Sequence, residues 1–114
     1  LKIFNANAQT MLESYRDGAY GYCGVMANMH PELYVRLWNS DFESREASLL
    51  QDYLGLAATV EALTYPCCAK DYLTRYRGIR MDTFARSADE KNYTPYQRSC
   101  IDQFAELSHH ITVR

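Results

Sequence analysis

The chain has 114 residues, of which 47% are hydrophobic and 23% charged, and its formal net charge is −2. This length allows one modest domain, and the composition is that of a folded protein rather than a disordered one. No run of Lys or Arg forms a basic stripe, and no apolar run approaches the roughly 20 residues of a membrane span. Neither a nucleic acid nor a membrane is therefore expected as a partner.

The first part of the chain alternates predicted strands and helices. Residues 1–5 form a short apolar run that is typical of a strand. Asn7 and Thr10 are candidate N-caps of a helix, which Gly18 is placed to end. Residues 20–26 predict a second strand, buried on both faces because apolar side chains occupy both. Two strands joined through a helix predict a parallel pair with a right-handed crossover.

The remainder of the chain is predicted to be helical. Pro31 suits the first turn of one helix, and helical periodicity extends over residues 44–64. A further helix begins at Pro66 and ends at Gly78, and a last one follows Thr94 after a polar loop. The predicted buried face of the longest helix comprises Leu49, Leu50, Tyr53, Leu56, Ala57, Val60 and Leu63.

Two parallel strands by themselves make a marginal sheet. The chain also begins at Leu1 without an initiator Met, inside the first predicted strand. We therefore expect it to be a fragment of a longer protein, with the missing strands supplied by that protein or by a partner.

The four cysteines predict no metal site, because none of them forms a C-x-x-C pair. The adjacent Cys67 and Cys68 are either a redox pair or buried thiols at the start of a helix. His109 and His110 are neighbours on a helix and point about 100° apart, which indicates a solvated helix end rather than a metal pair. His30 is expected in a helix-entry turn. Free thiols fit a reducing, cytoplasmic compartment.

A resemblance to a known family depends on residues in three parts of the chain. They are Gly18-Ala19 with Gly21, Val25, Ala27-Asn28 and Pro31, then Pro66, Lys70, Leu73 and Gly78, and finally Arg86. In their order and spacing they resemble the C-terminal portion of the dihydrodipicolinate synthase / N-acetylneuraminate lyase family. The resemblance implies an α/β fold: residues 1–43 as the last two βα units of a (β/α)8 TIM barrel, and residues 44–114 as a C-terminal three-helix extension.

The resemblance also implies a chemistry, namely that of a class I lyase or aldolase that forms a Schiff base with pyruvate or another 2-oxo acid. In this family the Schiff-base lysine lies on the sixth strand, upstream of Leu1, and no cofactor is needed. The chain's own lysines are not expected to be catalytic: Lys2 begins a strand, Lys70 lies on a helix and Lys91 in a polar loop. Relatives are commonly homo-oligomers.

The resemblance places five candidate substrate-binding residues at the carboxyl ends of the two strands: Asn5, Ala6, Asn7, Cys23 and Gly24. Ala6 and Asn7 stand where relatives carry a glycine followed by an acid that contacts the substrate. Gly24 is smaller than the serine often found there, so a wider pocket is expected. The alternatives are turn and N-cap chemistry for Asn5 and Asn7, and core packing for Cys23.

Two further interpretations of function stay open. The chain, which lacks a catalytic lysine of its own, would be a non-enzymatic helical module used for assembly, whose strands pair with another chain. A redox protein that uses Cys67 and Cys68 is the third possibility.

Overall fold

The computed structural model describes residues 1–113 and shows a mostly helical α/β structure. It divides into two compact units, Leu1–Ala58 and a second that begins at Thr59. The division falls inside helix α3 (Arg45–Glu61). The boundary that the sequence analysis places after residue 43, between the two βα units and the helical extension, stays a prediction.

The first unit contains a two-stranded parallel sheet, as the sequence predicts. Strand β1 (Phe4–Asn5) pairs with β2 (Gly21–Tyr22). The prediction of a strand over residues 20–26 was too long, because β2 ends after two residues and Val25–Asn28 forms the 3-10 turn η2. The ladder pairs Phe4 with Gly21 and Asn5 with Tyr22, and the backbone N–H of Tyr20 adds a hydrogen bond to the carbonyl oxygen of Ile3 at 2.7 Å.

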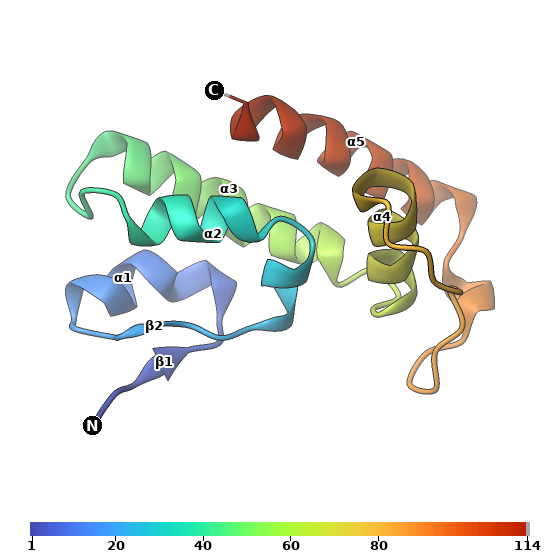
Figure 1. Cartoon of the computed structure of the whole chain (residues 1–114), viewed down its shortest axis with the longest axis horizontal. Coiled ribbons are helices and arrows are strands. Elements are labelled where there is room, and N and C mark those ends of the chain that lie inside the picture. Colours follow the sequence, from blue (N-terminus) through green and yellow to red (C-terminus); the bar gives the residue numbers. More distant parts are fainter. Residues whose placement is uncertain (114) are drawn as a thin grey trace. The chain divides into compact units, whose positions relative to one another are not determined.

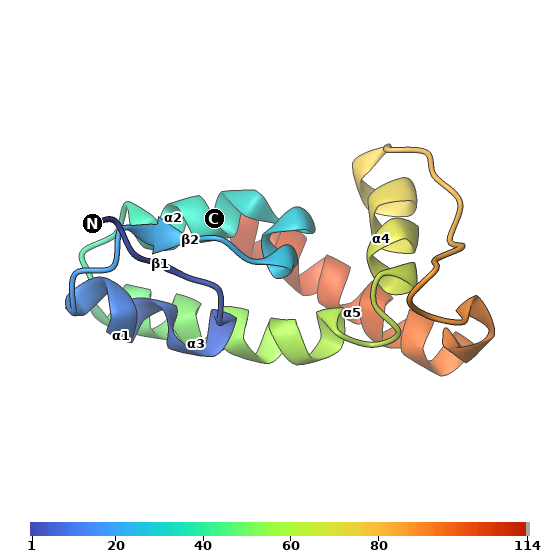
Figure 2. The same cartoon turned by 90° about the horizontal axis from the view of Figure 1, so that it is seen from below.

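Three helices lie beside this strand pair: α1 (Met11–Arg16), α2 (Pro31–Trp38) and the first-unit part of α3. In Figure 1 all three lie above β1 and β2, and in Figure 2 the strands run between α2 on one side and α1 and α3 on the other. The expectation that the second strand is buried on both faces is nevertheless wrong, because side chains along it are exposed. Tyr20 and Val25 are each about half exposed, and on β1 Phe4 is 51% exposed.

The turn between β1 and α1 is built by short polar side chains. Asn7 precedes a 3-10 turn (Ala8–Thr10), and its Oδ1 accepts a hydrogen bond from the backbone N–H of Gln9 at 2.8 Å. Asn7 thus caps as predicted, whereas Thr10 makes no side-chain capping bond. The chain leaves α1 through Gly18, whose φ of +95° favours glycine.

One glutamine joins α1 to α3 inside the first unit. Gln51 accepts a hydrogen bond from the backbone N–H of Leu12 at 2.8 Å and donates one to the carbonyl oxygen of Ala8 at 2.7 Å. Around it the unit buries apolar side chains of α1, α2 and α3: Met11, Leu12, Tyr15, Leu33, Leu37, Ala47, Leu54 and Ala57. The predicted face of α3 was partly wrong, because Leu49 and Leu56 are exposed.

The second unit packs α4 (Cys67–Arg77) against α5 (Pro95–Thr112). The rings of Tyr72 and Phe104 lie 5.6 Å apart between centroids at this contact. A long segment joins the two helices and includes the 3-10 turn η3 (Glu90–Asn92).

The predicted end of α4 and the predicted start of α5 are confirmed, and α4 begins one residue after Pro66. Gly78 ends α4 in the left-handed region at φ +69°, where a side chain would be strained. Thr94 Oγ1 caps α5 by accepting from the backbone N–H of Gln97 at 3.2 Å. On α5, Ile101 and Phe104 are buried, whereas Tyr96 and Leu107 are exposed.

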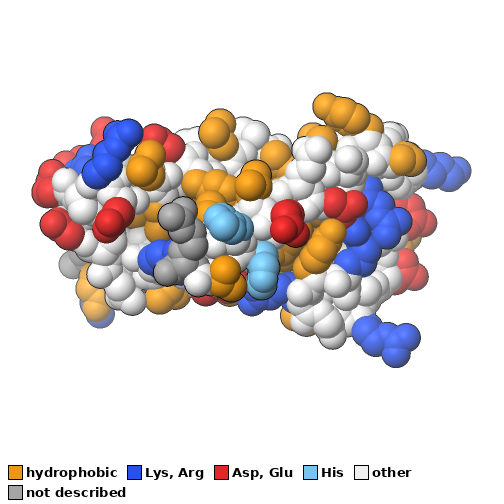
Figure 3. All heavy atoms as spheres, turned by 90° about the horizontal axis from the view of Figure 1, so that it is seen from above, with side chains coloured by type: hydrophobic (Ala, Val, Ile, Leu, Met, Phe, Trp, Pro, Cys, Tyr) orange, Lys and Arg blue, Asp and Glu red, His pale blue; other side chains and the backbone are white. Residues whose placement is uncertain are grey.

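Within residues 1–113, no helix combines the length and the apolar character needed to cross a bilayer. On the face drawn in Figure 3, acidic and basic side chains lie close to one another, and hydrophobic side chains form separate spots between them.

Candidate functional site

The carboxyl ends of β1 and β2 lie side by side in the first unit. The backbone N–H of Cys23, just after β2, donates to the carbonyl oxygen of Asn5, the last residue of β1, at 2.8 Å. This bond continues the parallel pairing by one residue. It brings the two groups of predicted site residues together, Asn5-Ala6-Asn7 from one strand and Cys23-Gly24 from the other.

The side chain of Asn5 is directed into its own turn. Its Nδ2 lies 3.0 Å from Ser14 Oγ and 3.1 Å from both the carbonyl oxygen and Oγ1 of Thr10. Its Oδ1 accepts from the backbone N–H of Asn7 at 2.8 Å. These contacts are those of the turn interpretation. Binding of substrate by Asn5 stays a prediction, and these hydrogen bonds would have to be kept or exchanged.

Ala6 and Asn7 are both exposed at this end of the strands. Asn7 Oδ1 is occupied by the cap on Gln9. Its amide nitrogen makes no hydrogen bond within residues 1–113 and is the group of Asn7 that remains available to a ligand.

Cys23 is exposed, so the alternative that it packs in the core is wrong. Its backbone N–H is already bonded to Asn5. Cys23 is thus a free, exposed cysteine at the carboxyl end of β2.

Gly24 does not open the site, contrary to the expectation from its small size. A Cβ added at this position would overlap the phenolic oxygen of Tyr22. The ring of Tyr22 is stacked on that of Tyr34 of α2, with centroids 4.8 Å apart and planes at 17°. Tyr22 thus fills the space that a side chain at position 24 would occupy.

Tyr22 is a site residue that reasoning from the sequence missed. Its position two residues before Gly24 was the available signal, because residues two apart on an extended strand share a face. Nearby, burial and the neighbouring Tyr22 raise the pKa of Tyr15 to about 12, so this phenol stays protonated at neutral pH.

None of the three lysines lies at the carboxyl ends of the strands. Lys2 precedes β1, and its ammonium lies 4.5 Å from the centroid of the Tyr20 ring. Lys70 is on α4 and donates to the carbonyl oxygen of Phe84, while Lys91 lies in η3.

The remaining candidate residues have structural surroundings. Cys67 and Cys68 are fully buried at the start of α4, which confirms the buried-thiol interpretation. Burial raises the pKa of Cys68 to about 12, and its thiol donates to the carbonyl oxygen of Glu61 at 3.0 Å. His30 lies in the helix-entry turn before α2, as expected.

The adjacent histidines are exposed in the last turn of α5, as a solvated helix end requires. No group of three or more His, Cys, Asp or Glu side chains within residues 1–113 is placed to hold a metal ion.

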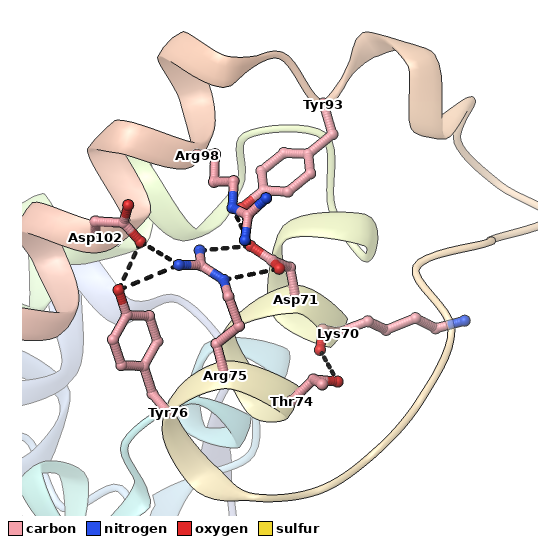
Figure 4. Close-up of polar contacts among 8 residues, drawn as sticks. All are labelled: Lys70, Asp71, Thr74, Arg75, Tyr76, Tyr93, Arg98 and Asp102. Atoms are coloured by element: carbon pink, nitrogen blue, oxygen red, sulfur yellow. Dashed lines mark hydrogen bonds and ion pairs between the residues drawn. The ribbon is translucent and has the colours of Figure 1, made fainter.

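A second cluster of polar side chains lies in the second unit, between α4 and α5 (Figure 4). Arg75 donates two hydrogen bonds to Asp71 of the same helix, from Nε to Oδ1 at 2.9 Å and from Nη2 to Oδ2 at 2.6 Å. Its Nη1 reaches Asp102 of α5 at 2.5 Å. Tyr76 donates to Asp102 and Tyr93 donates to Asp71, each at 2.6 Å. We call these five residues the Arg75 cluster.

The Arg75 cluster keeps both carboxylates ionised. Burial opposes the charge of Asp71, but hydrogen bonds from Arg75 and Tyr93 outweigh it and hold the pKa of this carboxyl below its usual value. The pKa of Asp102 is lowered by hydrogen bonds from Tyr76 and Arg75. Burial and the bond to Asp71 raise the pKa of Tyr93. Sequence reasoning missed this cluster, although Asp71 and Arg75 have the i, i+4 spacing of a helical ion pair.

Comparison with known proteins adds no relative: no family model, curated protein or solved structure matches the chain. The family resemblance therefore depends on the residues of this chain alone.

Proposed function

We propose that the chain is the C-terminal part of a Schiff-base lyase or aldolase that acts on pyruvate or another 2-oxo acid. Residues 1–43 would be the last two βα units of its (β/α)8 barrel, and residues 44–114 a helical extension. The observation that carries the proposal is the parallel pair β1–β2, joined through α1, whose carboxyl ends meet at the Cys23–Asn5 hydrogen bond.

The exposed aromatic side chain of Phe4 on β1 supports a barrel over a doubly wound sheet. In a doubly wound sheet, helices lie on both faces, whereas in a barrel they lie outside and the strands' inner faces pack on one another. Here Phe4 on β1 is half exposed, so the helices of the first unit leave this side chain of the strand pair uncovered. An exposed aromatic ring on a strand is accounted for when further strands pack against it.

Within such an enzyme this segment would supply a wall of the pocket. Barrel active sites lie at the carboxyl ends of the strands, where this chain places Asn5, Ala6, Asn7, Cys23 and Gly24. The Schiff base needs a lysine amine that condenses with the ketone of the substrate and loses water. Since no lysine of this chain lies at that end, another part of the protein would provide it.

Borohydride trapping tests the proposal. The native protein that contains these 114 residues is incubated with pyruvate, or with 2-oxobutyrate, and reduced with sodium borohydride, and its peptides are mapped by mass spectrometry. We expect an adduct on one lysine outside this segment and none on Lys2, Lys70 or Lys91. A sample reduced without the 2-oxo acid is the control.

Two results would contradict the proposal. If neither acid gives an adduct, the proposed lyase chemistry is wrong. If the adduct forms on one of the chain's own lysines, the proposal that this segment only supplies a wall of the pocket is wrong.

The alternative, a non-enzymatic assembly module, is favoured by one observation. Ile3 and Phe4 on and beside β1 are both more than half exposed, and within residues 1–113 β1 pairs with β2 alone. Such a strand edge pairs readily with another chain. If no adduct forms and Phe4→Asp abolishes self-association measured by analytical ultracentrifugation, the module is the better interpretation.

A further inference from the structure

The second unit contains a cavity that the proposed function does not use. It has a volume of about 450 Å³ and is lined by Asp71 of α4, by Glu90, Lys91 and Tyr93 around η3, and by Arg98 of α5 with its neighbours. This volume is within the range of small-molecule sites, about 300–1,000 Å³.

The carboxylates at this cavity are already supplied with donors from the protein. Asp71 accepts two hydrogen bonds from Arg75 and one from Tyr93. Glu90 Oε2 accepts from Thr83 Oγ1 at 2.9 Å. A cationic ligand would compete with these internal donors, so the cavity is poorly suited to a cation.

The cationic side chains at the cavity, Arg98 and Lys91, by contrast have N–H groups that donate no hydrogen bond within residues 1–113. Arg98 forms an ion pair with Asp71, its Nε lying 3.8 Å from Oδ2, and its two terminal nitrogens donate no hydrogen bond within residues 1–113. Figure 4 shows Arg98 approaching Asp71 from α5, while Arg75 approaches the same carboxylate along α4. The ammonium of Lys91 likewise makes no hydrogen bond or ion pair in the described part of the chain.

We infer that this cavity binds a small organic oxyanion, a carboxylate or a phosphate monoester, through the guanidinium of Arg98 and the ammonium of Lys91. An arginine with free terminal nitrogens presents two parallel donors that match a carboxylate or phosphate. Asp71, which also lines the cavity, lies beside this guanidinium, with Oδ2 3.8 Å from Arg98 Nε. The half-buried ring of Tyr93 and the ring of Pro95 provide apolar surface for an organic body.

The test is an NMR titration of the full 114-residue chain with phenyl phosphate, with benzoate and with neutral benzyl alcohol. We expect saturable shifts of backbone amides around η3 and the first turn of α5 with one or both anions. The anion that binds more tightly, phenyl phosphate or benzoate, identifies the preferred head group. Benzyl alcohol should give no such shifts. Added salt should lower the affinity of the chain for the anion, because it screens the attraction between the charges.

Variants separate this site from general attraction to positive charge. Arg98→Gln should weaken binding about tenfold or more, and Lys91→Gln less, because its ammonium is a single point charge. The anion affinity of Arg98→Lys should lie between those of the unmodified chain and Arg98→Gln, since lysine keeps the charge but not the paired donors. Arg80→Gln is the matched control: Arg80 is exposed on the same connecting segment but does not line the cavity.

Circular dichroism establishes that each variant is folded before its titration is compared. Absence of saturable shifts with both anions would overturn the inference. So would equal binding by Arg98→Gln and the unmodified chain, equal weakening by Arg80→Gln, or equal shifts with benzyl alcohol. Because the cavity lies in the second unit, none of these results depends on the lyase proposal.

Discussion

The phenolic oxygen of Tyr22 lies where a side chain at position 24 would have to begin. Gly24 itself has an ordinary extended conformation, with φ −143° and ψ 157°, which alanine also adopts. The need for glycine is therefore steric. We predict that Gly24→Ala lowers the free energy of unfolding by about 1–3 kcal/mol, as overpacking does, because Tyr22 must leave its stack on Tyr34. Urea denaturation measures this loss.

A double-mutant cycle provides the control for that prediction. In a Tyr22→Leu background the clash is gone, so Gly24→Ala should cost close to nothing. Gly55→Ala is the matched comparison, because a Cβ there meets only ordinary contacts of 3.6 Å or more and Gly55 lies inside α3. It should stabilise the chain by about 0.5–1 kcal/mol. Equal stability of Gly24→Ala and the unmodified chain would contradict the packing argument.

The two carboxylates of the Arg75 cluster should contribute unequally to stability. The side chain of Asp71 is 11% exposed and accepts three hydrogen bonds, whereas that of Asp102 is 47% exposed. We predict a loss of about 1.5–3 kcal/mol for Asp71→Asn and of under about 1 kcal/mol for Asp102→Asn. Urea denaturation at pH 7 compares them, and a larger loss for Asp102→Asn would contradict the assignment.

The contribution of Asp71 should also depend on pH. Its pKa is lower in the folded state than in the unfolded chain, so the unfolded state takes up the proton first as pH falls. The stabilisation is complete above about pH 4, the usual range of an aspartate, and is lost as pH falls through the lowered pKa. The difference in unfolding free energy between the unmodified chain and Asp71→Asn should therefore shrink from pH 5 to pH 2. A difference that stays constant would contradict it.

The cysteines should differ in reactivity. Cys23 is exposed, whereas Cys67 and Cys68 are fully buried and burial raises the pKa of Cys68 to about 12. We predict that iodoacetamide modifies Cys23 in the native chain and reaches Cys67 and Cys68 only after unfolding, as peptide mapping would show. Cys23→Ser should remove the fast reaction. Labelling of Cys68 at the rate of Cys23 would contradict the burial of the pair.

Asn5 should stabilise the turn after β1. We predict that Asn5→Ala lowers the free energy of unfolding by about 1–2 kcal/mol, because it removes the bonds to Thr10, Ser14 and the backbone of Asn7. Asn7→Ser, which keeps an oxygen for the cap on Gln9, should cost only a few tenths of a kcal/mol. Thermal denaturation compares the two, and an unchanged midpoint for Asn5→Ala would show that its contacts are dispensable.

The boundaries of helices could be predicted because they depend on residues next to one another in the sequence. A proline in the first turn at Pro31, the Thr94 cap and the left-handed Gly78 each act within a few residues of the helix end that they define. The parallel pairing of β1 and β2 was also predictable, because a helix between two short strands leaves few other arrangements.

Tertiary structure decided the properties of the candidate sites. Strand β2 ends where the chain enters the 3-10 turn η2, and the space at Gly24 is filled by the ring of Tyr22, which is stacked on Tyr34 of α2. Asp71 and Arg75 share a helix, but Asp102 and Tyr93 reach them only because α4 packs on α5. Local sequence determined where the helices begin and end, since those interactions span one turn. Packing between distant segments determined which side chains meet, since those contacts have no period in the sequence.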